Sequence, residues 1–523
     1  MLKTTFLRWA TRSMTVAALG LMALGVVLVV RTAGLTAVRV AVPAARGLAL
    51  DEPAAAGRLA GAVRIETVSH AGAAGADEVG KFTGLIAYLR KTFPAVDRGL
   101  RWEVVNGGSL LLTWEGRDRA LDPLLLLAHL DVVPAEAEPE AEVKADAREP
   151  TPWGELAFAG RVDGGFVWGR GTLDDKVSVV GMLEAAEALL KEGYGPRRTV
   201  LMALGRDEEV GGRQGAAALA DLLRRRGVRP ECVVDEGSFV LEGVVPFVAA
   251  PVAPVGVAEK GYADVELSVE SEGGHSSIPP PHTAIGLLSR AVARLEDHPY
   301  PTRLDAAGPT LRALGPGLPY PGRLAVANLW LFGPLVARVL AASPPTNALI
   351  RTTAAVTLIR GGTKDNVLPG SARAIVNYRL LPGDTSRGLL DHVRRAVADP
   401  AVKVRFADPA RYSEVFEASH VSPADTPAYA RLRAAILQTF PDALAVPYVI
   451  TAGTDARRYE GLSRNVYRFL PVRMAPGDLK RVHGADERIS LKSYGEAVRF
   501  YAHLIRQFDG TEPEAGQPAR RSP

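Results

Sequence analysis

The 523-residue sequence is poor in cysteine, in aromatic residues and in excess charge of either sign. Cys232 is the single cysteine, and one thiol forms neither an intramolecular disulfide nor a cysteine-based zinc site. Lysine and arginine number 62 against 58 acidic residues, with no long basic run, which argues against nucleic acid as a partner. The 47% hydrophobic content excludes disordered and fibrous classes. The chain is therefore globular, and any metal would be bound by histidines and carboxylates.

An uncharged apolar run covers residues 15–30, after three basic residues in the first fourteen. Its length lies between a signal-peptide core and a spanning helix, which needs about 17 to 25 residues. No good small-x-small cleavage site follows Val30, so we predict an uncleaved membrane anchor, with a helix over about residues 14–31 and a linker to residue 47. A buried core helix is the alternative. Because long domains cross membranes largely regardless of charge, we expect the rest of the chain on the exported side, whether periplasmic, lumenal or extracellular.

The rest of the chain shows two patterns of apolar residues. Residues 48–256 and 411–509 alternate short apolar runs with amphipathic stretches, which is typical of an α/β fold with a mainly parallel central sheet. Four consecutive leucines at 124–127 predict a strand buried on both faces. Residues 257–410 have the two-residue period of half-exposed strands mixed with helices, which predicts an inserted α+β domain. The tail, 510–523, is predicted to be disordered.

Possible metal ligands follow several predicted strands or turns. In an open α/β sheet the carboxyl ends of the strands line the ligand-binding crevice, so these side chains are expected to converge. Histidine nitrogens and carboxylate oxygens suit Zn²⁺ or a similar ion, and the set is rich enough for two ions that share a carboxylate. The segments are His129-Leu130-Asp131, Gly171-Thr172-Leu173-Asp174-Asp175, Asp207-Glu208-Glu209, Asp235-Glu236-Gly237 and Val482-His483-Gly484.

Each of these residues, taken alone, also has a structural explanation. Asp174 or Asp175 suits the N-cap of the next predicted helix, and His129 suits a hydrogen-bonded core histidine. The adjacent Glu208 and Glu209 are harder to explain in this way, because neighbouring carboxylates repel each other unless a cation is close. The combination therefore favours a metal site.

Longer motifs occur around these residues. They are His129-x-Asp131-Val132-Val133-Pro134, Gly169-Arg170-Gly171-x-x-Asp174-Asp175-Lys176, Glu208-Glu209-x-Gly211-Gly212, Gly273-Gly274-His275-Ser276-Ser277, Asn366-Val367-Leu368-Pro369, Gly453-Thr454-Asp455-Ala456-Arg457 and His483-Gly484. In this order they resemble the dizinc metallopeptidases that include carboxypeptidase S, aminoacylase and the glutamate-releasing carboxypeptidases. The resemblance covers roughly residues 55–505 and is closest to the branch of membrane-anchored carboxypeptidase S and N-acyl-amino-acid hydrolases. Ala452 departs from the family pattern, where a glycine is expected.

The resemblance implies a zinc-peptidase-like catalytic domain with two Zn²⁺ per subunit, which Co²⁺ or Mn²⁺ could replace. Asp174 would bridge the two ions. His129 and Asp235 would complete one site, and Glu209 and His483 the other.

Other family roles fall on residues around these ligands. Glu208 would be the general base, and Asp131 would orient His129 through its other ring nitrogen. His275 would stabilise the oxyanion in a partner subunit's active site. The candidates for binding the substrate carboxylate are Asn366, Arg379 and Arg457. Either arginine could instead form a structural salt bridge.

The resemblance implies a zinc-dependent amidohydrolase that cleaves the amide bond before the C-terminal amino acid of small peptides, as a carboxypeptidase or dipeptidase does. An N-acyl-amino-acid hydrolase is the alternative, and a membrane-tethered binding protein without activity is a remote one. The apolar stretch 309–332 either lines an acyl pocket or packs within the inserted domain. A homodimer through this lid domain is also expected.

Overall fold

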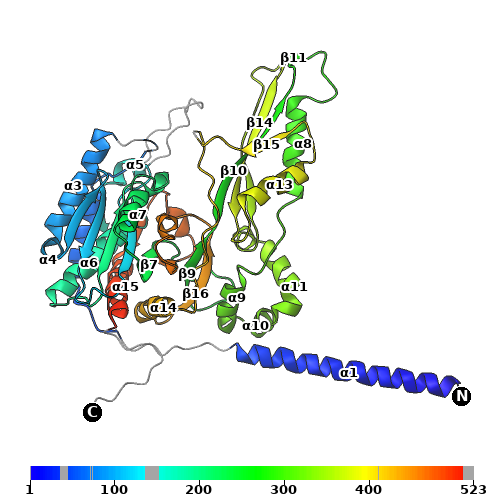
Figure 1. Cartoon of the computed structure of the whole chain (residues 1–523), viewed down its shortest axis with the longest axis horizontal. Coiled ribbons are helices and arrows are strands. Elements are labelled where there is room, and N and C mark those ends of the chain that lie inside the picture. Colours follow the sequence, from blue (N-terminus) through cyan, green and yellow to red (C-terminus); the bar gives the residue numbers. More distant parts are fainter. Residues whose placement is uncertain are drawn as a thin grey trace.

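The chain folds into two bodies, with a long N-terminal helix that extends away from them (Figure 1). The computed structural model describes residues 2–35, 45–70, 72, 75–135, 152–409 and 411–510. A ten-stranded sheet forms the centre of the main body, and a four-stranded sheet forms that of the second body. Residues 36–44 of the predicted linker and 511–523 of the predicted tail lie outside the described residues.

The central strands of the main sheet, β6, β3, β7 and β17, are neighbours in that order and run parallel. This confirms the predicted α/β fold with a mainly parallel central sheet. Strands β1 and β2 extend one side of the sheet in antiparallel pairing, and the other side continues through β9. The strands are β1 (Arg101–Val105), β2 (Ser109–Trp114), β3 (Leu124–His129), β6 (Val200–Gly205), β7 (Cys232–Asp235), β8 (Val240–Leu241), β9 (Val252–Glu259), β16 (Leu444–Ile450), β17 (Val466–Arg468) and β18 (Arg473–Met474).

The leucines of β3 are buried on both faces of the sheet, as predicted. Leu124 and Leu126 belong to one apolar cluster, and Leu125 and Leu127 belong to the cluster on the opposite face. Because burial of each leucine side chain contributes about 2 to 3 kcal/mol, this strand holds the sheet firmly between two layers. Helices of the first layer are α2 (Glu52–Val63), α3 (Ala76–Thr92), α4 (Pro94–Gly99), α6 (Lys176–Lys191), α14 (Pro427–Thr439) and α15 (Leu491–Asp509); those of the second are α7 (Ala216–Arg225) and η3 (Asp455–Tyr459).

The second body has strand order β12-β14-β10-β15, with helices α8 and α13 packed on its sheet. A short two-stranded ribbon, β11 with β13, forms its outer tip (Figure 1). The elements are β10 (Gly261–Glu270), β11 (Gly274–His275), α8 (Ala284–Asp297), α12 (Pro344–Asn347), β12 (Thr353–Gly361), β13 (Val367–Leu368), β14 (Ser371–Leu380), α13 (Ser386–Val397) and β15 (Lys403–Phe406).

The predicted start of the inserted domain, residue 257, falls inside β9, which is a strand of the main sheet. The second sheet begins only at β10. Within the insertion, α9 (Gly308–Leu314) lies beside β16 of the main body, where Thr310 Oγ1 donates to the carbonyl of Pro447 at 2.6 Å. The helices η2 (Gly315–Gly317) and α10 (Tyr320–Ala327) follow and pack against α9. Helix α11 (Leu329–Ala341) follows after a sharp bend of 119°.

The N-terminal helix α1 spans Leu2–Gly34, so it is longer than the helix predicted over about residues 14–31. Residues 13–34 are long and apolar enough to cross a membrane, with a mean hydropathy of 2.4, and their most apolar 18-residue window contains no buried residue. A signal sequence would pass the same test. Only the last turns of α1 contact the folded bodies, beside α10 (Figure 1).

Candidate active site

Three parallel strands place histidine and carboxylate side chains at one edge of the main sheet. His129 ends β3, Glu208 and Glu209 follow β6, and Glu236 follows β7. Since β6, β3 and β7 are adjacent and parallel, their carboxyl ends lie side by side. The predicted convergence at this edge is what the structure shows.

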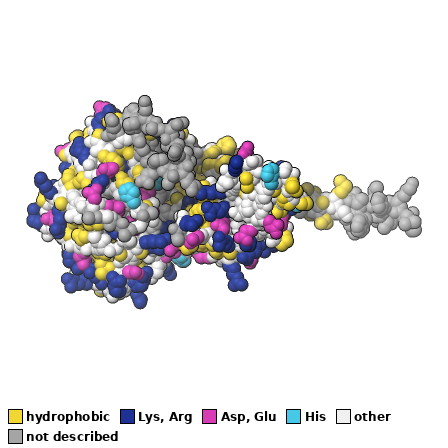
Figure 2. Space-filling model, turned by 90° about the horizontal axis from the view of Figure 1, so that it is seen from above, with side chains coloured by type: hydrophobic (Ala, Val, Ile, Leu, Met, Phe, Trp, Pro, Cys, Tyr) yellow, Lys and Arg dark blue, Asp and Glu magenta, His cyan; other side chains and the backbone are white. Residues whose placement is uncertain are grey.

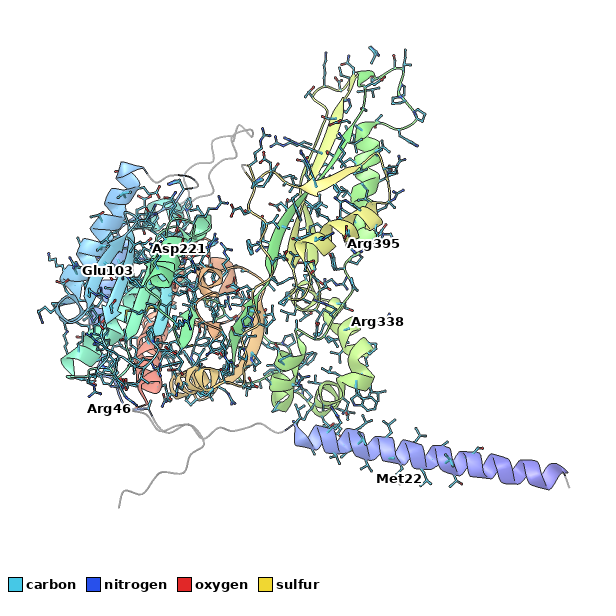
Figure 3. All side chains as sticks on the ribbon, viewed as in Figure 1. Met22, Arg46, Glu103, Asp221, Arg338 and Arg395 are labelled. Carbon is cyan, nitrogen blue, oxygen red and sulfur yellow. The ribbon has the colours of Figure 1, made fainter. Side chains whose placement is uncertain are left out.

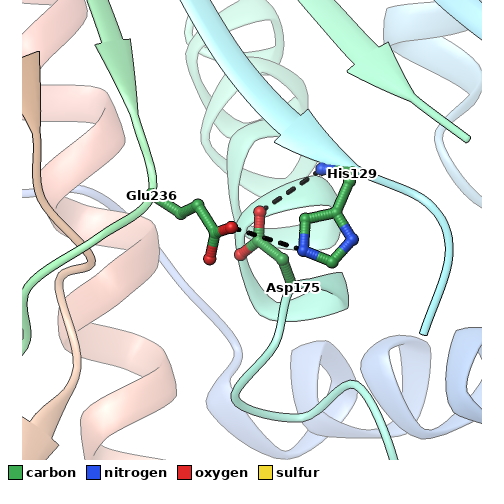
Figure 4. Close-up of side chains that lie close together, drawn as sticks. All are labelled: His129, Asp175 and Glu236. Atoms are coloured by element: carbon green, nitrogen blue, oxygen red, sulfur yellow. Dashed lines mark hydrogen bonds and ion pairs between the residues drawn. The ribbon is translucent and has the colours of Figure 1, made fainter. Parts of the chain in front are cut away.

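His129 lies at the centre of the cluster and is almost fully buried. Its Nδ1 lies 2.9 Å from the carbonyl oxygen of Asp131, so Nδ1–H can donate there and leave Nε2 as a free ligand nitrogen. Nε2 lies 2.9 Å from Oδ1 of Asp174. It also lies 3.4 Å from Oε1 of Glu236 (Figure 4). Burial opposes protonation, but the contacts with the carboxylates of Asp131, Asp174 and Glu236 outweigh it and raise the pKa of His129.

Asp174 lies between the two histidines. Its Oδ2 is 3.1 Å from Nε2 of His483, and the same nitrogen is 3.2 Å from Oε1 of Glu209. Against the effect of burial, the two histidines hold the pKa of Asp174 well below its usual range. His483 has a left-handed backbone at φ 58°, a strained conformation for a residue with a side chain. The fold therefore accepts backbone strain to bring this ring into the cluster.

Glu236, rather than the predicted Asp235, occupies the position against His129. The carboxylate of Asp235 instead accepts the backbone N–H groups of Ala456 at 2.7 Å and of Glu236 at 2.9 Å. The reason is local: Asp235 is the last residue of β7 and its side chain is used to fix η3, while the next residue turns toward the cluster. Burial and nearby carboxylates raise the pKa of Glu236 to about 8.

Asp175, like Glu236, lies in the cluster although the sequence did not predict it as a metal ligand. It precedes α6 but makes no side-chain cap to that helix. Its Oδ2 accepts a long hydrogen bond of 3.4 Å from the backbone N–H of His129, and its buried Oδ1 has no hydrogen-bond partner (Figure 4). His129, Asp175 and Glu236 place ligand atoms within 4.8 Å of one another, as do His129, Asp174 and Glu209.

Asp131 fixes the turn that carries the two glutamates. Its Oδ1 accepts the N–H of Glu208, and its Oδ2 accepts the N–H of Glu209, both at 3.1 Å. Ser69 Oγ donates to the same carboxylate at 2.6 Å. Asp131 therefore positions Glu208 and Glu209 in addition to contacting His129. The short helix η1 (Glu208–Val210) ends at Gly211, whose φ of 105° suits glycine.

Glu208 has no hydrogen-bond or ion-pair partner for its carboxylate within the described ranges. Burial raises the pKa of Glu208 well above the usual range; His129 opposes this shift, and the neighbouring acidic groups add to it. The side chain is thus held near the cluster without being engaged by it, which leaves its oxygens able to exchange a proton.

A buried ion pair that the sequence analysis did not single out joins the loop before Asp174 to the loop of His483. Glu487 accepts from Arg170 Nη1 at 2.7 Å and from the backbone N–H groups of Gly171 and Leu173. Arg170 also donates to the carbonyl of His483 at 3.3 Å. The loop from Gly169 leads out of the small sheet β4 (Arg161–Asp163), β5 (Phe166–Trp168) and β19 (Arg488–Ser490). This contact bridges more than 300 residues of sequence, so no local pattern signals it.

The chemistry of the cluster fits a divalent metal. Atoms bound tetrahedrally at 2.0 to 2.1 Å from an ion lie about 3.3 Å apart, which is the separation seen around both histidines. Glu209 Oε1 lies 3.2 Å from His483 Nε2 yet is not in hydrogen-bond geometry, and Asp175 Oδ1 is orphaned. Closely spaced buried carboxylates of this kind repel each other without a cation.

The predicted carboxylate-binding arginines lie near each other where the two bodies meet. The guanidinium of Arg379 lies over the ring of Tyr262 at 4.7 Å, and that of Arg457 over Phe416 at 4.5 Å; these two rings stack. Arg457 donates to the carbonyl of Gly211, just after the glutamate turn. Within the described ranges neither guanidinium has a carboxylate within 4.0 Å. Basic side chains gather between the bodies in the view from above (Figure 2).

His275 and Asn366 lie together at the tip of the second body, apart from the metal-ligand cluster. His275 is in β11, and the N–H of Ser276 donates to the carbonyl of Asn366 at 3.3 Å. The ring of His275 is exposed and accepts or donates only to Ser277. Strand β11, which carries His275, lies at the outer end of the second body, well away from β7, the neighbour of β3 in the main sheet (Figure 1).

Comparison with known proteins places the chain among characterised sequences. It is 38% identical to a probable carboxypeptidase S-like protein of Dictyostelium discoideum over 86% of this chain and 84% of that protein. It is 40% identical to an N-fatty-acyl-amino acid synthase/hydrolase of Mus musculus over 86% of this chain and 87% of that protein. Carboxypeptidase S of Saccharomyces cerevisiae is 32% identical, over 86% and 83%.

Solved structures show the same fold at low identity. A metallo-carboxypeptidase from Sulfolobus solfataricus has a TM-score of 0.58 and 15% identity, over 88% of this chain and all of that one. Human carnosine dipeptidase 1 also has a TM-score of 0.58, with 16% identity over 88% and 96%. Residues 125–507 match the peptidase family M20/M25/M40, and this segment includes every residue of the cluster. The chain belongs to peptidase family M20/M25/M40.

Proposed function

We propose that the protein is a dizinc amidohydrolase that cleaves the amide bond preceding an amino acid with a free carboxylate. The observation that supports this most is the placement of Asp174 between His129 and His483, with Glu208 beside them and unengaged. The arginine pair at the junction of the two bodies supplies a site for the carboxylate.

The ligands divide into two sets that share Asp174. His129 and Glu236 would hold one ion, and Glu209 and His483 the other, with Asp175 near the first set. When bound, such ions supply positive charge that activates water and stabilises the negative charge that develops on the amide oxygen. Asp131 keeps His129 and the glutamate turn in place for this purpose.

Glu208 is suited to proton transfer. Its backbone is fixed by Asp131, and its carboxylate has no partner of its own in the described part of the chain. It would accept a proton from the attacking water and donate that proton to the amine nitrogen as the amide bond breaks. The same carboxylate is thus base and then acid, and no other proton carrier is required.

Arg379 is the better candidate of the two arginines for the substrate carboxylate. Arg457 already donates to the carbonyl of Gly211, whereas the guanidinium of Arg379 has no hydrogen-bond or ion-pair partner in the described ranges. Burial lowers the pKa of Arg379, because a charged guanidinium is disfavoured away from water. A planar carboxylate would satisfy its fork of N–H groups.

We expect Arg379→Lys to raise KM about tenfold to a hundredfold for substrates with a free carboxylate, because a lost charge-assisted contact costs about 1.5 to 3 kcal/mol. Substrates whose carboxylate is amidated should show no such change. Steady-state kinetics on matched pairs of substrates measures the difference. Arg373→Lys, on the same strand β14, serves as control. Equal loss on both substrate forms would contradict carboxylate recognition by Arg379.

The acyl side of the substrate has two candidates. A small peptide agrees with the carboxypeptidase S relatives. An N-fatty-acyl amino acid is favoured by relatives with that name in several vertebrates, at 38 to 41% identity. Both place an amino acid carboxylate next to the amide bond that is cleaved, so the same arginine and metal sites serve either one.

The test is hydrolysis by the zinc-loaded full chain in detergent, on a panel of dipeptides and N-acyl amino acids of increasing chain length. Preference for dipeptides supports the carboxypeptidase or dipeptidase, and preference for long acyl chains supports the N-acyl-amino-acid hydrolase. Glu208→Ala is the inactive control. If neither substrate class is cleaved and no metal binds, the catalytic proposal is wrong and a binding protein becomes the better explanation.

The assignment of Glu236 in place of Asp235 has its own prediction. Glu236→Gln should lower the zinc content to about one ion per chain at limiting metal, because one donor to the first set is lost. Asp235→Asn should retain both ions and instead lower thermal stability, since it weakens the acceptor for Ala456 N–H. Metal analysis and a melting curve on the two variants decide whether Glu236 or Asp235 is the ligand. Loss of an ion in Asp235→Asn but not in Glu236→Gln would show that Asp235 is the ligand.

Two further parts of the proposal concern assembly and location. His275 and Asn366 could reach a metal cluster only in a partner subunit, so we infer a homodimer through the second body, whose β12 is an open, largely exposed edge strand. Helix α1 would serve as an uncleaved single-pass membrane anchor, with the catalytic body on the exported side.

A further inference from the structure

Helix α11 presents an apolar face that no described part of the chain covers. Its sequence, LWLFGPLVARVLA, contains no acidic residue and a single basic one. Exposed positions recur at four-residue intervals and so lie along one side of the helix. Four of them are large and apolar: Trp330 is 58% exposed, Leu331 41%, Leu335 58% and Val339 62%.

This face is unusual for a helix surrounded by water. Burying such side chains contributes about 1.5 to 3 kcal/mol each, so a face with four of them exposed favours an apolar partner. The opposite side of the helix is partly covered by its own chain; Gly333, for example, is buried. The helix is therefore held by the fold on one side and left uncovered on the other.

The start of α11 is joined directly to the last turns of α1. Asn328 Nδ2 donates to the carbonyl of Leu28 at 3.3 Å and lies 3.4 Å from Thr32 Oγ1. Arg31 Nε donates to the carbonyl of Ala327, also at 3.3 Å. Asn328 is completely buried at this contact. The junction of α10 and α11 therefore lies level with the end of the apolar segment of α1.

The dimensions place this junction at a membrane surface if α1 crosses the bilayer. Residues 13–34 form 22 residues of helix, about 33 Å long, which matches a hydrocarbon core of about 30 Å. Arg31 and Asn328 then stand near the boundary between lipid tails and headgroups. In Figures 1 and 3, α11 runs across the direction of α1, and its outer side, which carries Arg338, faces the way that α1 extends.

We propose that the outer face of α11 lies in the surface of the same bilayer that α1 crosses. The proposal rests on the membrane anchor of the preceding section and extends it to a second, interfacial contact from the catalytic chain itself. Trp330 suits the interface because its apolar ring carries a polar N–H, and Arg338 suits the phosphate groups above the apolar side chains. Leu331, Leu335 and Val339 would enter the upper part of the lipid tails.

Two attachment points restrict the orientation of the protein on the membrane. A single helix followed by a linker would leave the folded bodies free to rotate. With α1 and α11 both in the bilayer, the second body lies against the lipid, and the main body stands farther from it (Figure 1). The active site would then lie at a fixed distance from the membrane surface, where amphiphilic substrates partition.

The test uses the full chain in phospholipid nanodiscs, with an environment-sensitive fluorophore on introduced cysteines. Cys232 is fully buried, so labelling is selective for the new thiol. The test positions are Leu335→Cys and Val339→Cys; Met22→Cys in α1 reports on the anchor, and Val104→Cys, 59% exposed on β1, reports on solvent. Each is measured with and without lipids that carry spin-label quenchers at two depths, just below the headgroups and near the bilayer centre where position 22 would lie, and hydrolysis is checked in each variant to confirm the fold.

We expect fluorescence at positions 335 and 339 to fall by about half with the quencher below the headgroups, and fluorescence at position 104 to stay unchanged. If position 22 is quenched while 335 and 339 behave like 104, α11 is not in the bilayer and the inference is wrong, although the anchor stands. Labels at 335 and 339 that are shielded from water but not quenched indicate a second copy of the chain as the cover, which also overturns it. If position 22 is not quenched, the anchor and this inference fail together, and the hydrolase proposal is unaffected.

Discussion

Replacing Glu208 with Gln is expected to lower kcat by about 10³- to 10⁴-fold while metal content and fold are retained. The substitution keeps the size of the side chain and removes only its ability to accept and return a proton. The backbone contacts that position this turn come from Asp131 and do not involve the Glu208 carboxylate. Since the Glu208 carboxylate has no hydrogen-bond or ion-pair partner in the described chain, the substitution removes no such contact.

The measurement is single-turnover hydrolysis at saturating substrate, with zinc content determined on the same sample. Glu296→Gln, on the exposed side of α8, is the matched surface control and should behave as the unmodified protein. A variant with normal zinc content and at least a tenth of the original rate would show that another group carries the proton. Loss of zinc together with activity would instead make Glu208 a ligand.

Asp174→Asn is expected to cause the second large loss, because Asp174 lies within 3.1 Å of a ring nitrogen of both His129 and His483. The asparagine side chain is neutral and has only one oxygen, so it cannot bind two metal ions as a carboxylate can. The zinc content should therefore fall from two ions to at most one per chain. Activity should then fall by about 10³-fold or more, by loss of the charge that stabilises the developing oxyanion. The pKa of Asp174 is already held low by the two histidines, so the native site contains it as a carboxylate at neutral pH.

Thermal stability gives an independent readout of the same substitution. Ligand bound at about 1,000 times its Kd stabilises a fold by about 4 kcal/mol, so both Asp174→Asn and removal of metal with a chelator should lower the Tm by several degrees. Zinc should restore the Tm of the chelated native protein but not that of the variant. Asp163→Asn, on exposed β4, is the control. If Asp174→Asn keeps two ions and its activity, the bridging assignment is wrong.

Much of the fold could be predicted because its signals are local. The leucine run predicted β3, and helical spacing after Asp175 predicted α6, which the structure begins at Lys176. The change of periodicity indicated a second α+β body, although its predicted start lies within β9. Strand β9 belongs to the main sheet, and the second sheet begins only with β10. Packing in three dimensions, which the local pattern does not show, determines which sheet each strand joins.

Only part of the candidate site could be predicted from the sequence. Side chains at the ends of adjacent parallel strands lie close together, which accounts for His129 and Glu209. Asp174 and His483 reach the same cluster from two loops that the Arg170–Glu487 ion pair joins. Asp235 and Glu236 are adjacent carboxylates after one strand, and the sequence cannot say which one turns toward the histidine. The contact between Asp235 and Ala456 N–H, from a segment more than 200 residues away, decides it.

The sequence by itself determined the kind of chemistry available, because residue types, their order and their positions after strands are local properties. It also determined the apolar α1 and the absence of any cysteine-based metal site. Only the tertiary structure decided which carboxylate faces His129, how Arg170 and Glu487 join two loops, and that α11 leaves an apolar face uncovered beside the end of α1. These features depend on contacts between segments hundreds of residues apart, whose energies are fixed by packing in three dimensions and leave no periodic pattern in the chain.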